Sequence, residues 1–215
     1  MINKSTKMNI KKRIYIIGAG GHGKVVASIA RLNGYKEILF VDDKIKFLNN
    51  YEVICSTSNI QRLFNEDPKS DYFVAIGNNV IRENFFNIIN QNNITQPILI
   101  HPSAIIDPTV NIGEGTVIMA NVVINADTII GKSCIINTAA TIDHDCICKD
   151  FIHISPGVHI AGTVHIGNKT WIGIGSSAIN NITICNEVTV GGGATIIADI
   201  KESGEYVGTP VRRIR

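Results

Sequence analysis

The sequence predicts an α/β domain over residues 1–100, followed by a left-handed parallel β-helix over residues 101–215. Two patterns support this division: a strand–helix–strand pattern near the N-terminus, and a strict six-residue period that begins near Ile106. The composition agrees, because 45% of the 215 residues are hydrophobic but only 6% are aromatic. Such an aliphatic, glycine-rich composition favours stacked strands over a helical bundle.

The first hundred residues are predicted to form a Rossmann-like βαβ unit. Short runs rich in β-formers predict strands, and apolar residues at helical spacing predict helices. The expected strands cover residues 13–17, 37–41, 72–76 and 97–100, and the expected helices cover residues 24–32 and 81–90. This unit is about half the size of a complete dinucleotide-binding fold, which argues against a full NAD site.

A glycine-rich turn connects the first strand to the first helix. Gly18, Gly20 and Gly23 match the pattern G-x-G-x-x-G in the required structural context. Such a turn lets the backbone approach a phosphate, and the helix N-terminus offers free N–H groups. Asp42 ends the second strand, where a carboxylate can accept a hydrogen bond from a ribose or a base. We interpret the turn as a nucleotide site; the alternative is a tight turn that merely requires glycine.

From Ile106 to Ile196 every sixth residue is apolar. The series contains sixteen residues, of which thirteen are isoleucine, and no insertion interrupts it. This pattern predicts a strand-and-turn unit of six residues, three of which close one triangular coil. Each apolar position then points inward and stacks on the residue eighteen positions away. A single coil cannot bury its own inner face, so several coils must stack.

The same period places the cysteines. Cys134, Cys146 and Cys148 fall on inward positions, whereas His144 and His153 fall on outward ones. A metal ion cannot easily be shared across the wall of the prism, so we expect no metal site and interpret the cysteines as small core residues.

His144 is the candidate catalytic residue. It lies between two acidic residues in the segment TIDHD, and Gly162, one coil away, leaves space beside it. An imidazole with an adjacent carboxylate suits a general base acting on an amine or hydroxyl, although a solvated surface histidine fits equally well. His153, nine residues from His144, could line the same cleft. Trp171, one coil above His153, could form a cofactor wall or pack at a corner, and packing is favoured.

Composition excludes several classes of function. A net charge of +2 without a basic block gives no support for nucleic-acid binding. No apolar run approaches the roughly 18 residues of a membrane span, and the polar start does not resemble a signal peptide. Five cysteines in such a chain predict reduced thiols and a cytoplasmic location.

The combined motifs resemble the PglD/NeuD family of sugar acetyltransferases. The resemblance runs from about Arg13 to Arg213 and rests on the segments IIGAGGHGKVV, FVDD, AIGNN, INTAATIDHDC, FIHISPGVHIAG and GGGATII. It implies transfer of acetyl from acetyl-CoA to the 4-amino group of a nucleotide-linked 4-amino-4,6-dideoxy sugar. It also implies a homotrimer and a role in surface polysaccharide or glycoprotein glycan biosynthesis.

The resemblance assigns roles to individual residues. His144 matches the general base and Asp145 the carboxylate that tunes it. Positions matching the family's substrate-binding residues are Gly20, Gly21, His22, Asp42, Asp43, Gly77 and Asn137. Positions that match acetyl-CoA contacts are His153, Ile174 and Gly192, and the backbone N–H of Gly162 is a candidate for the oxyanion and the cofactor.

The sequence departs from the family pattern at one position, and three alternative functions remain open. Lys44 stands where close relatives often carry arginine, which leaves the nucleobase open between UDP and GDP, with UDP favoured. The related alternative is an O-acetyltransferase acting on sialic acid or another sugar. The unrelated alternatives are an NAD-binding protein and a non-catalytic binding protein built on the β-helix.

Overall fold

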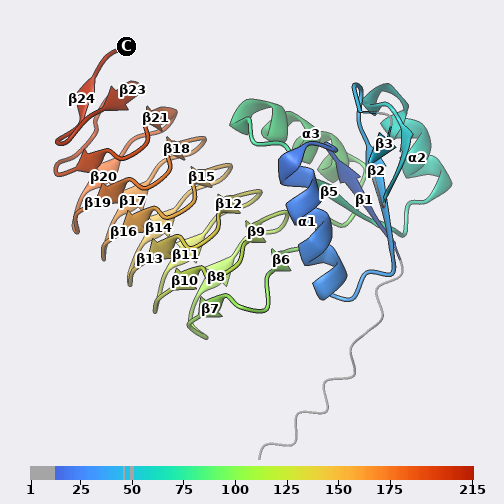
Figure 1. Ribbon diagram of the computed structural model, residues 1–215, viewed down its shortest axis with the longest axis horizontal. Coiled ribbons are helices and arrows are strands. Elements are labelled where there is room, and N and C mark those ends of the chain that lie inside the picture. Colours follow the sequence, from blue (N-terminus) through green and yellow to red (C-terminus); the bar gives the residue numbers. More distant parts are fainter. Residues whose placement is uncertain (1–12, 46, 49–50) are drawn as a thin grey trace, which may run out of the picture.

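A computed structural model describes residues 13–45, 47–48 and 51–215 of the chain. An α/β domain packs beside one end of a long stack of triangular coils, and the C-terminus lies at the far end of the stack (Figure 1). The fold predicted from the sequence is therefore confirmed in both halves. Among the described residues, no helix has the length and apolar character needed to cross a membrane.

The N-terminal sheet has five strands in the order β3-β4-β2-β1-β5. Strands β1, β2, β4 and β5 run parallel, and β3 pairs antiparallel to β4. The bounds are β1 (Arg13–Ile17), β2 (Glu37–Val41), β3 (Phe47–Leu48), β4 (Tyr51–Cys55) and β5 (Asp71–Val74). Strands β1 and β5 are almost wholly buried, as continuous apolar runs in a parallel sheet require.

Three helices flank this sheet: α1 (Gly21–Leu32), α2 (Ile60–Glu66) and α3 (Asn79–Gln91). Helix α1 begins three residues before the predicted start, because Gly20 already serves as its N-cap. Helix α3 begins where the Asn78 side chain accepts a hydrogen bond from the backbone N–H of Ile81 at 3.0 Å. A 3₁₀ turn, η1 (Thr57–Asn59), precedes α2. The sequence did not predict β3, β4 or α2.

The β-helix has three faces, each a parallel sheet of short strands. Face 1 comprises β6 (Leu99–Ile100), β9 (Val117–Ile118), β12 (Ile135–Ile136), β15 (His153–Ile154), β18 (Trp171–Ile172), β21 (Val188–Val190) and β23 (Gly204–Val207), with β24 (Arg212–Arg213) antiparallel at its end. Face 2 comprises β7 (Ile105–Ile106), β10 (Val123–Ile124), β13 (Thr141–Ile142), β16 (His159–Ile160), β19 (Ser177–Ala178) and β22 (Thr195–Ile196). Face 3 comprises β8 (Asn111–Ile112), β11 (Ile129–Ile130), β14 (Ile147–Cys148), β17 (His165–Ile166) and β20 (Thr183–Ile184).

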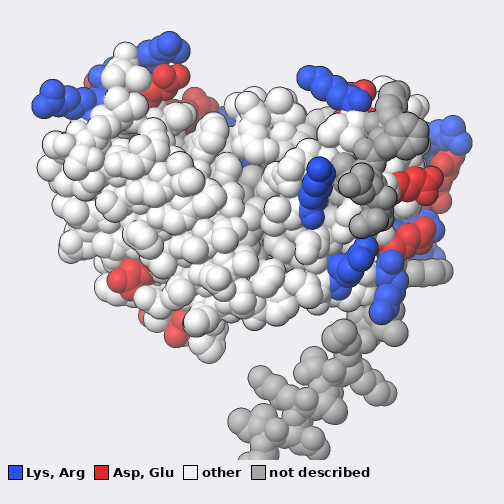
Figure 2. All heavy atoms as spheres, in the orientation of Figure 1, with Lys and Arg blue, Asp and Glu red and all other residues white. Residues whose placement is uncertain are grey.

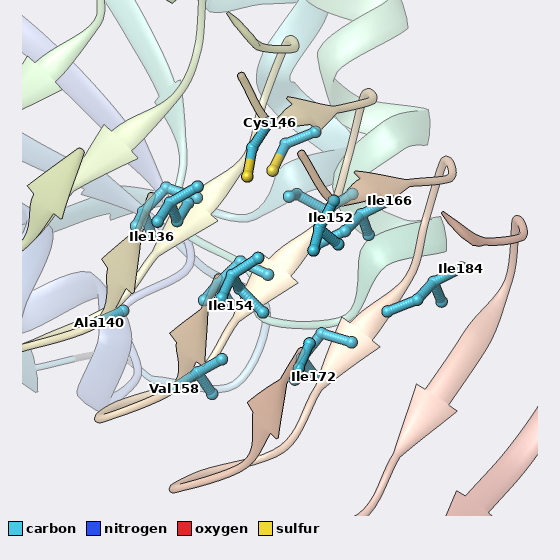
Figure 3. Close-up of a cluster of buried hydrophobic side chains, with 14 of the residues drawn as sticks. Ile136, Ala140, Cys146, Ile152, Ile154, Val158, Ile166, Ile172 and Ile184 are labelled. Carbon is cyan, nitrogen blue, oxygen red and sulfur yellow. The ribbon is translucent and has the colours of Figure 1, made fainter. Parts of the chain in front are cut away.

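The core of the β-helix is a column of aliphatic side chains. From β6 to β22 each strand pairs in register with the strand eighteen residues away, so Ile136, Ile154 and Ile172 stack on one another (Figure 3). Cys134, Cys146 and Cys148 lie in the same core and are at most 1% exposed, as the period predicted. Each fully buried isoleucine contributes about 1.5–3 kcal/mol relative to an exposed one.

One residue at each corner adopts a left-handed backbone conformation. Examples are Ser133, Asp145, Phe151 and Lys169, with φ between 48° and 59°. Aspartate and asparagine tolerate this conformation better than most residues. Asp145 thus shapes the turn that also carries His144.

The two halves share a continuous core. Strand β6 was expected to end the first unit, but it pairs with β9 and forms the first rung of face 1. Leu99, Val117 and Ile135 pack into the same apolar cluster as residues of β1 and α1. The α/β domain is therefore fixed against face 1 by shared packing.

Candidate active site

His144 lies on the turn that joins β13 of face 2 to β14 of face 3. Its ring Nδ1 is 2.7 Å from Oδ2 of Asp145. Asp143 accepts a hydrogen bond from the His144 backbone N–H at 2.9 Å and another from the Asn125 side chain at 2.7 Å. The hydrogen bond to Asp145 raises the pKa of His144 above its ordinary value. With Nδ1 held by Asp145, Nε2 is the nitrogen available to accept a proton.

The imidazole of His144 lies directly over Gly162 on the next coil. A Cβ added at Gly162 would come within 2.6 Å of ring atoms Cε1 and Nε2. The space left by the missing side chain, expected to receive a ligand, is therefore taken up by the imidazole itself. Any side chain larger than hydrogen at position 162 would displace the ring.

The glycine-rich turn divides into glycines that pack and glycines that border open space. Gly18 has a φ of +103°, and a Cβ at Gly23 would lie 2.0 Å from the Gly18 carbonyl oxygen, so both positions require glycine for packing. A Cβ at Gly20, Gly21 or Gly77 would meet nothing within 4 Å. Gly20 and Gly21 thus leave open space at the N-terminus of α1, where a phosphate can approach backbone N–H groups, and Gly77 leaves open space in the turn after β5.

Asp42 and Asp43 shape the loop after β2. Burial tends to raise the pKa of Asp42, but hydrogen bonds from three backbone amides outweigh it and lower the pKa. The donors to Asp42 are the N–H groups of Ala19, Lys44 and Ile45, each at 2.8 Å. Asp43 accepts from both the backbone N–H and the hydroxyl of Thr57. Asp42 therefore ties the glycine-rich turn to this loop, and its predicted contact with a ribose or base would use its remaining lone pairs.

His22 and His153 are both enclosed at the junction of the two halves. Burial, aided by the positive charge of Arg82, lowers the pKa of His22 to about 4 and that of His153 to about 3. Nε2 of His22 and Nδ1 of His153 are buried without a hydrogen-bond partner in the structure. Both imidazoles are therefore neutral at physiological pH.

Trp171 forms a wall beside His153. The two rings stack with centroids 5.5 Å apart and planes 1° from parallel. The indole N–H donates to the Ser155 hydroxyl at 2.8 Å, and Asn137 approaches Nε2 of His153 at 3.4 Å. Trp171 remains 44% exposed, so it borders open space rather than packing at a corner as the sequence favoured.

Two adjoining cavities open on either side of this wall. A cavity of about 560 Å³ is lined by Gly77, Asn78, Asn79, Val80, His153, Lys169, Trp171, Glu187 and Thr189. A second, of about 450 Å³, is lined by Asn137, His153, Ser155, Pro156, Trp171, Gly173, Ile174, Thr189, Val190, Gly191 and Gly192. We call the two together the face 1 cleft. It brings together five of the predicted site residues: Gly77, Asn137, His153, Ile174 and Gly192.

His144 does not line the face 1 cleft. Its turn joins faces 2 and 3, whereas His153 lies on face 1, so within a single chain the two histidines do not line one cleft. The physical reason is that successive six-residue units turn by a third of the prism. Arg82, which reaches the junction from α3, was not singled out from the sequence, because an arginine on an amphipathic helix gives no periodic signal.

Comparisons with known proteins agree with this architecture. The family model of the PglD N-terminal domain matches residues 13–89. The acetyltransferase domain of PglB from Neisseria gonorrhoeae is 39% identical with a TM-score of 0.91, over 94% of this chain and 99% of that chain. A histidine-to-alanine variant of the GDP-perosamine N-acetyltransferase from Caulobacter crescentus, in complex with CoA and GDP-perosamine, is 34% identical with a TM-score of 0.87, over 93% of this chain and 95% of that chain.

A curated relative adds a second nucleotide. The UDP-N-acetylbacillosamine N-acetyltransferase of Bacillus subtilis is 35% identical over 115 residues. That alignment spans 51% of this chain and about half of the relative, 52%. The fold and the acetyltransferases that it matches thus define the class: an acetyltransferase built on a hexapeptide-repeat β-helix. The chain belongs to the PglD/NeuD family of sugar acetyltransferases, which confirms the family and enzyme class expected from the sequence.

Proposed function

We propose that this protein transfers the acetyl group of acetyl-CoA to the 4-amino group of a nucleotide-linked 4-amino-4,6-dideoxy sugar. The observation that carries the proposal is the His144–Asp145 pair, an imidazole with its carboxylate, in a chain that also has a nucleotide-type glycine turn and an open cleft. One relative is named for UDP-N-acetylbacillosamine, and another was solved in complex with CoA and GDP-perosamine. These names support a CoA thioester as the donor and a nucleotide-linked amino sugar as the acceptor.

In this proposal acetyl-CoA occupies the cavity of the face 1 cleft that Ile174 and Gly192 line. Ile174 is 63% exposed beside Gly192, which offers an apolar edge and a close backbone approach for the pantetheine arm. His153 and Trp171 form the wall between the two cavities. The open space at Gly20, Gly21 and Gly77 takes the phosphates and sugar of the acceptor. The identities do not separate the nucleotides, because the UDP-linked curated relative is 35% identical over 115 residues and the GDP-perosamine enzyme is 34% identical over 93% of this chain.

The chemistry is direct acyl transfer. Nε2 of His144 removes a proton from the sugar amine as the amine attacks the thioester carbonyl, and the tetrahedral intermediate then releases CoA thiolate. Asp145 keeps the ring in the tautomer whose Nε2 is free. A backbone N–H, with Gly162 as the candidate, stabilises the oxyanion. Most of the acceleration comes from holding both substrates in reach of each other.

The proposed site is shared between copies of the chain in a homotrimer. His144 lies on the corner between faces 2 and 3, so the base that serves the face 1 cleft comes from a neighbouring β-helix. The β-helix flank visible in Figure 2 carries very few charged side chains, whereas charges gather over the α/β domain and at the C-terminal end. A weakly charged flank suits packing against a second copy.

Thiol release from acetyl-CoA tests the activity. The acceptors are UDP- and GDP-linked 4-amino-4,6-dideoxy sugars, free sialic acid and a blank, with His144→Ala alongside. We expect release with one nucleotide-linked amino sugar and a loss of about 10²–10⁴-fold in the variant. Release with sialic acid alone would replace N-acetylation by O-acetylation. Full activity of His144→Ala would remove His144 from the mechanism.

A complementation experiment tests the shared site. His144→Ala keeps its cleft, and Gly21→Glu keeps its base but places a carboxylate in the open space expected to take phosphate. In a trimer with sites between neighbours, every mixed trimer of these two inactive chains regains one intact site. Random mixing should therefore restore about a quarter of the wild-type activity. No recovery in mixed trimers would place base and cleft in one chain.

A further inference from the structure

Helix α3 lies along the corner of the β-helix between faces 3 and 1. The left-handed residues of three successive coils, Ser133, Phe151 and Lys169, all turn their backbone carbonyls toward it. Arg82 donates from Nε to the Ser133 carbonyl at 2.7 Å and from Nη2 to the Phe151 carbonyl at 2.8 Å. The Asn79 side chain donates to the Lys169 carbonyl at 2.8 Å. A row of corner carbonyls thus receives one face of the helix.

Arg82 also bonds back to the α/β domain. Its Nη1 donates to the carbonyl of Ile76 at 3.0 Å and to that of Gly77 at 3.1 Å. Its Nη2 donates in addition to the Ile152 carbonyl at 3.1 Å and to Oδ1 of Asn79 at 2.8 Å. All six acceptors are neutral, and five of them are backbone carbonyls. An exposed fraction of 1% makes Arg82 the largest fully buried side chain among the described residues.

Burying a guanidinium among carbonyls is costly compared with burying an apolar side chain. The burial lowers the pKa of Arg82 to about 10, so the group is still charged at neutral pH. The planar guanidinium of Arg82 suits this junction, because its N–H groups reach acceptors in the α/β domain and in the β-helix at once. Packing alone is already supplied nearby by the edge-to-face contact of Phe86 and Phe151, whose ring centroids lie 5.4 Å apart.

Both ends of this network belong to the site. Gly77 borders the larger cavity, and the Ile152 carbonyl immediately precedes His153 on β15. We propose that Arg82 is a positioning residue that locks the Ile76–Gly77 turn to the corner leading into His153, and so holds the acceptor and the acetyl donor in register. This inference rests on the proposed acetyl transfer, and it goes beyond it by assigning a role to a residue that touches neither substrate.

Three variants of the full chain separate positioning from packing. Arg82→Met removes all six hydrogen bonds, and Arg82→Lys keeps a cation but loses the fork. Glu83→Gln is the matched control, because it neutralises the partner of Lys169 at 3.3 Å in the same helix–corner contact without touching the turn. The measurements are kcat, the KM of each substrate, the Kd of CoA and amide hydrogen exchange at residues 76–79, all below the unfolding temperature.

For Arg82→Met we expect kcat to fall by about 10²-fold, the loss typical of a misplacement near 1 Å. Arg82→Lys should fall by about tenfold, and Glu83→Gln should stay within about twofold of wild type. The Kd of CoA should change by less than about threefold in each, because β-helix residues alone line the Ile174 cavity. Exchange at residues 76–79 should accelerate in both Arg82 variants only.

Unchanged kcat and unchanged exchange in Arg82→Lys, with only a lower unfolding temperature, would reduce Arg82 to a packing role and overturn the proposal. Equal losses in Glu83→Gln would do the same. If Arg82→Met does not fold, Arg82→Lys decides alone. If the wild type transfers acetyl to none of the acceptors, the proposed function fails, and hydrogen exchange still decides whether Arg82 fixes the turn.

Discussion

Replacing Gly162 by alanine should remove most of the activity without unfolding the protein. The added Cβ would lie 2.6 Å from Cε1 and Nε2 of His144, whereas non-bonded carbon atoms in contact lie about 3.5–4.0 Å apart. The imidazole must therefore move by about 1 Å or rotate out of its place. Either motion carries Nε2 away from the position where the sugar amine is expected.

The expected losses of stability and of activity in Gly162→Ala follow from which atoms move. The contact involves the free end of an exposed side chain, and Gly162 does not have a positive φ, so alanine fits the backbone. The free energy of unfolding should therefore change by less than about 1 kcal/mol. A catalytic group displaced by 1 Å costs about 10²-fold in rate, so kcat should fall by about that factor. The KM of acetyl-CoA should stay within about threefold, because the face 1 cleft is unaltered.

The assay is thiol release from acetyl-CoA with the best nucleotide-linked amino sugar, run beside thermal unfolding. His144→Ala and the double variant provide the control, since two changes that act through one group are not additive. The double variant should be no slower than His144→Ala alone. A Gly162→Ala protein with wild-type kcat would refute the reasoning, and so would a double variant in which the two losses multiply.

Three further predictions follow from the titratable groups. Protonated His144 cannot accept a proton, so kcat/KM should fall as the pH drops through the raised pKa of His144. Asp145→Asn should shift this fall in kcat/KM to lower pH and reduce the maximal kcat/KM. An unshifted pH profile would contradict the pairing of His144 with Asp145. In the folded chain the buried His22 and His153 stay neutral down to about pH 4 and about pH 3. In the unfolded chain both histidines bind protons below about pH 6.5. The free energy of unfolding should therefore decrease below about pH 6.5, by up to about 1.4 kcal/mol per histidine per pH unit. Urea titrations should show this slope flattened in His153→Asn, and equal stability at pH 7 and pH 5 would contradict it. Burial raises the pKa of Cys134 to about 12, and Cys146 and Cys148 are buried with it. A thiol reagent should therefore label the folded chain only at the partly exposed Cys55 and Cys185. Fast labelling of all five cysteines would be the contrary result.

The β-helix could be predicted residue by residue because its period is both strict and physical. An inward position recurs every six residues, and a polar residue there would face a dry core, so the period alone assigns Ile142, Cys146 and Cys148 correctly to the interior. The α/β domain carries weaker signals. Strand β4 and helix α2 are short and only partly buried, and their mixed patterns favour neither a strand nor a helix clearly.

The candidate site was predictable as a set of residues but not as an arrangement. The motifs identified His144 and His153 correctly as outward-facing residues, yet nine residues of separation suggested a common cleft that the coil geometry forbids within one chain. The packing of α3 against the β-helix could not be predicted from the sequence either, because no local pattern indicates which helix packs against which corner. Arg82 illustrates this, since only the assembled junction brings its six acceptors together.

The six-residue period that builds the core also decides which residues can cooperate. A neighbour in space on one face is eighteen residues away in sequence, and two pairs at the site obey this rule: His144 lies over Gly162, and His153 stacks on Trp171. The corner that receives α3 follows it as well, through Phe151 and the corner residues of the adjacent coils. An insertion of six residues between His153 and Trp171 would keep the hydrophobic pattern but carry Trp171 to another face. The unbroken register is therefore a requirement of the site as much as of the core.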